Sequence, residues 1–139
     1  MRENNQRVEE QGLEEDPVRD RIYELLPKRV GVRKQKHPSK TDTLLLATAL
    51  AAGFLNGQDK VVLTNDKPIA SSLILFSTLL LNTPRKLYLD DIDDFLNGFF
   101  MRVCRIWTDT YGFELKQRAA FNGEKYLHLR RGAMRGNPY

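Results

Sequence analysis

Apolar residues recur at intervals of three or four along residues 16–26 and predict a first helix. Its apolar face is formed by Val18, Ile22, Leu25 and Leu26. Asp16 stands directly before Pro17, an arrangement typical of a helix start, and Pro27 ends the pattern. Residues 1–15 are polar and rich in Gln, Asn and Glu, so we expect them to form a flexible N-terminal segment.

Two longer apolar segments, residues 44–55 and 69–81, predict buried helices. The first belongs to a helix over residues 42–55 that is apolar on nearly every side and must be covered on several of them. Each segment has about a dozen residues, fewer than the roughly 20 needed to cross a bilayer. Polar residues 56–60 separate them, so we expect a soluble protein with no membrane partner.

Val61, Val62 and Leu63 form a short run bounded by turn residues, which predicts a central strand buried on both faces. Residues 86–89 predict a second strand, and Asp90 or Asp91 after it would cap a further helix, with Asp93 and Asp94 also at N-terminal helix positions. The apolar face of that helix would contain Ile92, Phe95, Leu96, Phe99, Val103 and Ile106. The predicted order of helix, strand, helix, strand and helix indicates an α/β fold with a short parallel sheet and helices on both faces.

The dipeptide Asn122-Gly123 is the strongest short hairpin signal in the chain. It predicts a C-terminal β-hairpin made of residues 115–121 and 125–131. Tyr126, His128 and Arg130 would then alternate on one face, as on a strand that stacks nucleic-acid bases, although plain strand patterning explains the same alternation.

The chain of 139 residues is long enough for one packed domain, and its 41% hydrophobic and 29% charged content is typical of a globular protein. We expect three parts: a flexible segment at 1–15, an α/β domain at 16–108, and a basic hairpin with its tail at 109–139. The single cysteine, Cys104, excludes an intramolecular disulfide and fits a reducing compartment such as the cytoplasm.

Positive charge is concentrated on both sides of a more acidic middle. Residues 28–40 contain six Lys and Arg and no acid, and residues 101–139 contain eight against three acids. Basic flanks of this kind favour a polyanion such as RNA, with binding that weakens steeply as salt rises. A solvated surface that keeps the protein soluble explains the charge equally well.

Two carboxylates are placed where α/β sheets form their sites. Asp66 follows the strand at 61–63, and Asp42 lies in the first turn of the helix that leads into this strand. Sites in open α/β sheets form beyond the carboxyl ends of strands. Paired carboxylates there favour Mg²⁺ or Mn²⁺, which can hold a phosphodiester and activate water. Alternatively, Asp42 complements the helix dipole and Asp66 shapes a turn.

Residues 39–50, SKTDTLLLATAL, followed by residues 61–67, VVLTNDK, resemble the later half of a PIN domain. Most members of this family are Mg²⁺- or Mn²⁺-dependent ribonucleases, and many are toxins of toxin–antitoxin pairs. The resemblance covers about sixty residues, from 38 to 97, and implies part of a three-layer α/β fold. It implies that Asp42 and Asp66 are metal ligands, supported by Asn65 and by Thr64, which would contact metal or phosphate.

The first half of the family pattern departs from this sequence. The family begins with a hydrophobic strand that ends in an aspartate, and residues 1–27 contain no such pattern. The family's glutamate ligand would be Glu24, which the exposed face of an amphipathic helix explains equally well. Residues expected to contact an RNA backbone are Lys28, Arg29, Arg33, Lys34, Lys36, His37 and Lys40.

The leading hypothesis is therefore a PIN-like Mg²⁺- or Mn²⁺-dependent ribonuclease or RNA-binding protein, truncated or diverged in its first half. The alternative is a catalytically inactive PIN-like module that acts as a binding or assembly subunit. A third hypothesis is half a domain whose other half is encoded upstream or in a second gene. Half a domain would leave sheet edges and apolar helix faces uncovered, so a second copy or a partner chain is expected to complete it.

Overall fold

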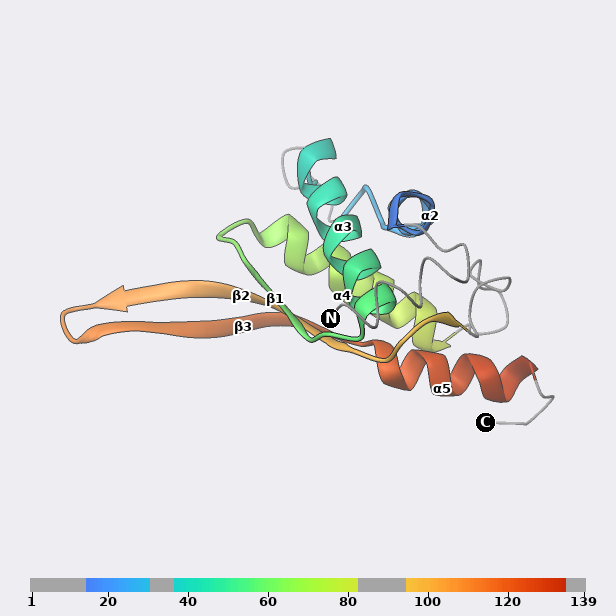
Figure 1. The fold of residues 1–139 in the computed structure, drawn as a ribbon. Coiled ribbons are helices and arrows are strands. Elements are labelled where there is room, and N and C mark those ends of the chain that lie inside the picture. Colours follow the sequence, from blue (N-terminus) through green and yellow to red (C-terminus); the bar gives the residue numbers. More distant parts are fainter. Residues whose placement is uncertain (1–14, 31–36, 83–94, 135–139) are drawn as a thin grey trace.

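The computed structural model describes residues 15–30, 37–82 and 95–134, so the predicted flexible segment lies outside the described residues apart from Glu15. The elements are α2 (Glu15–Leu25), α3 (Lys40–Asn56), β1 (Lys60–Leu63), α4 (Lys67–Asn82), β2 (Phe100–Asp109), β3 (Gly112–Asn122) and α5 (Gly123–Met134). The strands form one sheet in the order β1-β2-β3, in which β1 is parallel and β3 antiparallel to β2. The α/β class is confirmed, but the sheet is mixed rather than wholly parallel (Figure 1).

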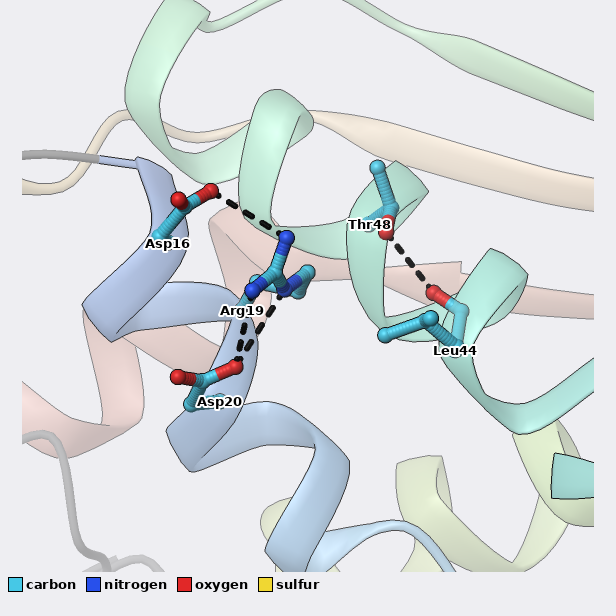
Figure 2. A network of polar contacts seen from close by, with 5 residues as sticks. All are labelled: Asp16, Arg19, Asp20, Leu44 and Thr48. Carbon is cyan, nitrogen blue, oxygen red and sulfur yellow. Dashed lines mark hydrogen bonds and ion pairs between the residues drawn. The ribbon is translucent and has the colours of Figure 1, made fainter. Parts of the chain in front are cut away.

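Helix α2 confirms the first predicted helix and packs on α3 with its apolar face, where Val18 and Ile22 are buried. On its exposed side, Arg19 forms ion pairs with Asp16 and Asp20, each at 3.1 Å (Figure 2). Exposed pairs of this kind add little stability, so the buried face holds α2 in place. Its C-terminal end is tied to α4, because Ser72 Oγ donates to the Pro27 carbonyl oxygen at 2.9 Å.

Helix α3 is the central helix of the fold, and both of its ends are capped. Ser39 caps the start, where its hydroxyl accepts from the backbone N–H of Asp42. Gly57 follows the end with φ 64°, a conformation that glycine adopts without a Cβ penalty, and its N–H donates to the Gly53 carbonyl. The carbonyls of the last turn are further satisfied by Asn97, whose side-chain amide donates to Leu55 at 2.9 Å.

The strand predicted at 61–63 is present as β1, but it is an edge strand of the described sheet rather than a central one. Only Val62 is buried, whereas Val61 and Leu63 are 45% and 51% exposed. Side chains alternate between the two faces of a strand, so a helix layer on one face covers every second residue. The β-branched run identified the strand correctly but could not identify its neighbours.

The helix predicted with Phe99, Val103 and Ile106 on its apolar face is wrong, because residues 100–109 form strand β2. The apolar spacing also fits strand alternation, which places Met101 and Val103 in the core. The predicted strand at 86–89 and the acids Asp90, Asp91, Asp93 and Asp94 lie outside the described residues.

The C-terminal hairpin predicted around Asn122-Gly123 is also wrong. The observed hairpin joins β2 to β3 through residues 110–111, and Asn122 instead caps helix α5 by accepting from the N–H of Lys125 at 3.0 Å. Residues 125–131 are therefore helical. Within α5, Tyr126 and Arg130 are buried and His128 is exposed, so the three do not share a strand face.

The core contains an aromatic cluster to which α3, the sheet and α5 contribute, and aliphatic residues of α2, α3 and α4 complete it. Phe54 lies 4.8 Å from Phe99 and 5.9 Å from Tyr126, measured between ring centroids, and both pairs are edge-on. Phe121 of β3 packs against the same rings. The expected domain boundary at 108/109 falls at the end of the hairpin arm. Phe121 and Tyr126, which follow this boundary, therefore belong to the same core as residues that precede it.

Helices α2, α3 and α4 lie on one side of the sheet, and the hairpin of β2 and β3 extends beyond them as a two-stranded arm (Figure 1). The opposite side of the sheet, called the open face below, carries exposed apolar side chains from all three strands. These are Val61, Leu63, Phe100, Ile106, Phe113 and Leu115. The expected helices on both faces are therefore not found among the residues that the structure describes. Among the described residues, no helix is both long enough and apolar enough to span a membrane.

Candidate functional site

The two carboxylates predicted to form a site lie around the same pocket. Asp42 is in the first turn of α3, and Asp66 is in the loop between β1 and α4. Both line a pocket of about 450 Å³, called the carboxylate pocket below. Its other lining residues are His37, Ser39, Asn65, Lys67 and Pro68. The beginnings of two helices and the carboxyl end of a parallel strand thus meet here, as the topology rule for α/β sheets predicts.

Asp42 is held in place by the cap of its own helix. Its Oδ2 accepts from the Ser39 backbone N–H at 3.4 Å, while its own N–H donates to Ser39 Oγ at 3.1 Å. The carboxylate is half-buried, and within the described chain its Oδ1 accepts no hydrogen bond. One oxygen is therefore committed to the cap and the other is available to a ligand.

Asp66 is placed by a tight turn after β1. The Thr64 N–H donates to the Cys104 carbonyl at 3.0 Å, which continues the pairing of β1 with β2 by one residue. Thr64 Oγ1 then accepts from the Asp66 N–H at 3.1 Å and fixes the turn. The Asp66 side chain is exposed, and among residues of known placement no donor holds its carboxylate.

His37 joins the pocket from the other side. Its Nδ1 lies 3.0 Å from the Val30 backbone nitrogen, which donates to it, and 3.1 Å from the Val30 carbonyl oxygen. When Nδ1 accepts, the ring proton is on Nε2. The ring is then oriented by the backbone and can offer an N–H to an anion.

Glu24 and Lys28 lie outside the lining of this pocket. Glu24 is exposed on α2, and its charge acts on Lys28. Partial desolvation lowers the pKa of Lys28 below its ordinary value, and the Glu24 carboxylate acts in the opposite direction. The Lys28 ammonium donates to the Tyr23 carbonyl and lies 4.6 Å from the centroid of the Tyr23 ring, so it points back along α2.

The remaining basic residues of the predicted RNA contact are only partly placed. Arg29 is exposed after α2, and Lys40 is exposed at the first position of α3, next to the lining residue Ser39. Arg33, Lys34 and Lys36 lie outside the described residues.

The donor set of the carboxylate pocket suits Mg²⁺ or Mn²⁺. In the described ranges, no three or more His, Cys, Asp or Glu residues are grouped closely enough to hold a metal ion. Mg²⁺ usually keeps several waters and is held by one or two carboxylates together with substrate phosphate. Asp42 and Asp66, with the amide oxygen of Asn65 nearby, supply oxygen ligands of this kind.

Comparison with known proteins gave no identification. No family model, no curated protein and no solved structure matches this chain. The PIN-like interpretation therefore rests on residues 39–50 and 61–67 and on the geometry of the carboxylate pocket, and it stays a prediction.

A second pocket adjoins the first and was not predicted from the sequence. It has a volume of about 190 Å³ and shares Asn65, Asp66 and Lys67 with the carboxylate pocket. Arg105 of β2 and Arg118 of β3 line it from the hairpin. Neither arginine was predicted as a site residue, because Arg105 was expected on a helix and Arg118 on the first strand of a hairpin that includes residues 125–131. For Arg105, the β-branched and aromatic residues around it were the available signal for a strand.

Proposed function

We propose that this protein is a PIN-like ribonuclease that binds single-stranded RNA and cleaves it with Mg²⁺ or Mn²⁺. The observation that carries the proposal is the lining of one pocket by Asp42 and Asp66 at the carboxyl end of β1. The PIN resemblance gives these residues the same role. Lys67 and the oriented ring of His37 add positive charge and an N–H donor at the same pocket.

The described side chains supply distinct parts of this chemistry. Asp42 and Asp66 would hold the ion through carboxylate oxygens, and Asn65 would assist. A bound Mg²⁺ would activate water and stabilise the leaving oxygen of the phosphodiester. Lys67, at the start of α4, would hold a phosphate by charge, and the partial positive charge of the helix N-terminus adds to that attraction.

A cleavage assay tests the proposal directly. End-labelled single-stranded RNA is incubated with wild type and with Asp66→Asn in Mg²⁺, in Mn²⁺ and in EDTA. Because the Asp66 carboxylate is exposed, the substitution should leave the fold intact while removing a charged metal ligand. We expect a rate at least about 100-fold lower, since loss of even an outer-shell partner costs 10–100-fold in metal affinity or activity.

Asp20→Asn is the matched control, because Asp20 is an exposed carboxylate on α2 that lines neither pocket. This control should cleave RNA at the wild-type rate. Equal rates for wild type and Asp66→Asn, or a rate that does not depend on metal, would remove the enzymatic part of the proposal.

The second candidate is an inactive PIN-like module that binds RNA or assembles with a partner. It is favoured by the commitment of Asp42 Oδ2 to the cap of α3, a structural use of that carboxylate. Calorimetric titration with Mn²⁺ separates the two candidates. Heat of binding that disappears in Asp66→Asn supports the enzyme, whereas RNA binding without any Mn²⁺ heat supports the inactive module.

A further inference from the structure

The second pocket gathers positive charge that has no partner within the described part of the chain. Lys67, Arg105 and Arg118 line it together with one carboxylate, Asp66, and no described carboxylate forms an ion pair with any of the three. Arg105 Nε is buried and has no hydrogen-bond partner among the described residues. Cations gathered in this way favour an anionic ligand, because a phosphate would supply the missing acceptors.

Arg118 reaches this pocket because of an irregularity in strand pairing. Val103 pairs with Ala119, but the next residue, Cys104, pairs with Gln117. Arg118 is therefore the extra residue of a β-bulge. Bulges re-aim a side chain and are frequent next to functional sites. Here the bulge places Arg118 in the same pocket as Arg105 of the neighbouring strand.

An aromatic residue continues the basic surface along the arm. Trp107 lies two residues after Arg105 on β2 and therefore on the same face of the hairpin. Lys116 Nζ lies 4.4 Å from the Trp107 ring centroid, and Arg105 Cζ lies 5.8 Å from it. Trp107 as a residue is 43% exposed. Proteins that bind single-stranded nucleic acid stack bases on exposed aromatic side chains within a positively charged groove, and Trp107 is an exposed aromatic residue beside two cations.

We infer that these features form one RNA track, which runs from the carboxylate pocket across Lys67, Arg118 and Arg105 to Trp107. The inference rests on the proposed function and extends it by naming the path of the RNA strand and the side chains that contact it. A volume of about 190 Å³ is below the roughly 300–1,000 Å³ of pockets for drug-sized ligands, so the second pocket accepts one group of a polymer, such as a phosphate. Trp107 stacks the base of a neighbouring nucleotide.

The test measures RNA binding without cleavage. A fluorescent single-stranded oligouridylate is titrated in EDTA at several salt concentrations, with wild type and with the double variant Arg105→Gln, Arg118→Gln. The slope of log affinity against log salt should become shallower by about 1.4, which is about 0.7 for each lost phosphate contact. The control Arg19→Gln, Lys125→Gln removes the same charge from α2 and α5, outside both pockets, and should keep the wild-type slope.

Trp107→Ala tests stacking and has its own control on the opposite face of the same arm. We expect it to weaken binding at least about fivefold, the lower limit for loss of one base–aromatic stack. Phe113→Ala should bind as wild type, because Phe113 is 75% exposed but pairs with Thr108 on the open face. Equal losses in the two variants would overturn the stacking role.

Other outcomes are informative in separate ways. Poly-glutamate that competes as well as RNA, or preferred binding to anionic vesicles, would overturn the assignment to RNA. If the arginine double variant binds RNA like wild type while cleavage still needs Asp66, the RNA track is rejected and the nuclease proposal is retained. If RNA binding depends on the two arginines but the protein cleaves no RNA, the nuclease proposal is rejected and the RNA track is retained.

Discussion

Phe99 packs so closely against α3 that the helix needs a residue without a side chain there. A Cβ added at Gly53 would lie 2.3 Å from two ring atoms of Phe99, closer than packed carbon atoms approach one another. Phe54, the next residue, packs edge-on against the same ring. The Phe99 ring therefore packs against the backbone of α3 at Gly53 and against the rings of Phe54 and Phe121.

Gly53→Ala should therefore destabilise the protein. We expect a loss of about 1–3 kcal/mol in the free energy of unfolding, because the added methyl group overpacks the core. Urea denaturation followed by circular dichroism measures it. Gly132→Ala is the matched control, since Gly132 lies in α5 with open space at its Cβ position. That change should stabilise by roughly 0.5–1 kcal/mol through helix propensity. A Gly53→Ala protein as stable as wild type would contradict the close contact.

At the scale of elements, the cap of α3 couples helix stability to the candidate site. Ser39 and Asp42 bond to each other's backbone N–H groups, and both line the carboxylate pocket. The residue that starts the helix therefore also orients a proposed metal ligand.

Ser39→Ala should lower the free energy of unfolding by about 1 kcal/mol, the usual effect of losing a serine N-cap. Thermal and urea denaturation measure this change. Ser77→Ala, inside α4, should leave stability unchanged or slightly higher, because alanine has the better helix propensity. If both variants lost the same stability, serine truncation in general and not the cap would explain the result.

The sequence pattern correctly predicted those helices and strands whose periodicity, caps and turn residues all lie within a short stretch of the chain. Helices α2, α3 and α4 and strand β1 were predicted from periodicity, caps and turn residues. Asp42 and Asp66 were proposed as site residues because strand ends mark sites in α/β sheets, and both line one pocket. Strand β2 was predicted as a helix because its apolar spacing fits both periods. The Asn122-Gly123 signal was misplaced because Asn122 also serves as a good helix cap.

The remaining features depend on contacts between distant residues, which no local pattern contains. The edge position of β1 is decided by which strands pair. Arg118 enters the second pocket only because the register of β2 and β3 shifts by one residue. Basic charge in the C-terminal region was noticed from composition, but its convergence with Lys67 required the tertiary structure.

At the scale of the whole molecule, the open face is the main unexplained surface. Six large apolar side chains from three strands are exposed on one side of the sheet, and β1 leaves an unpaired edge in the described sheet. Monomeric proteins rarely expose broad contiguous apolar patches, and free strand edges tend to pair with other chains.

The prediction that a second copy or a partner chain covers this surface therefore stays, and self-association is the form of it that can be tested with this chain alone. Sedimentation velocity should show an apparent mass that rises with protein concentration. The double variant Leu63→Lys, Leu115→Lys places charge on the open face and should sediment as a monomer. Tyr111→Lys, at the fully exposed end of the arm, should behave as wild type. A clean monomer of the wild-type chain over the whole concentration range counts against the prediction.

The single cysteine gives this molecule a practical property. Cys104 is 1% exposed, with its sulfur shielded in the middle of β2, and a buried thiol of this kind reacts slowly with alkylating reagents. Cysteines introduced at exposed positions such as Lys40 and Tyr111 can therefore be labelled with fluorophores without first removing the native one. Energy transfer between two such labels would follow the distance from the carboxylate pocket to the tip of the arm in solution.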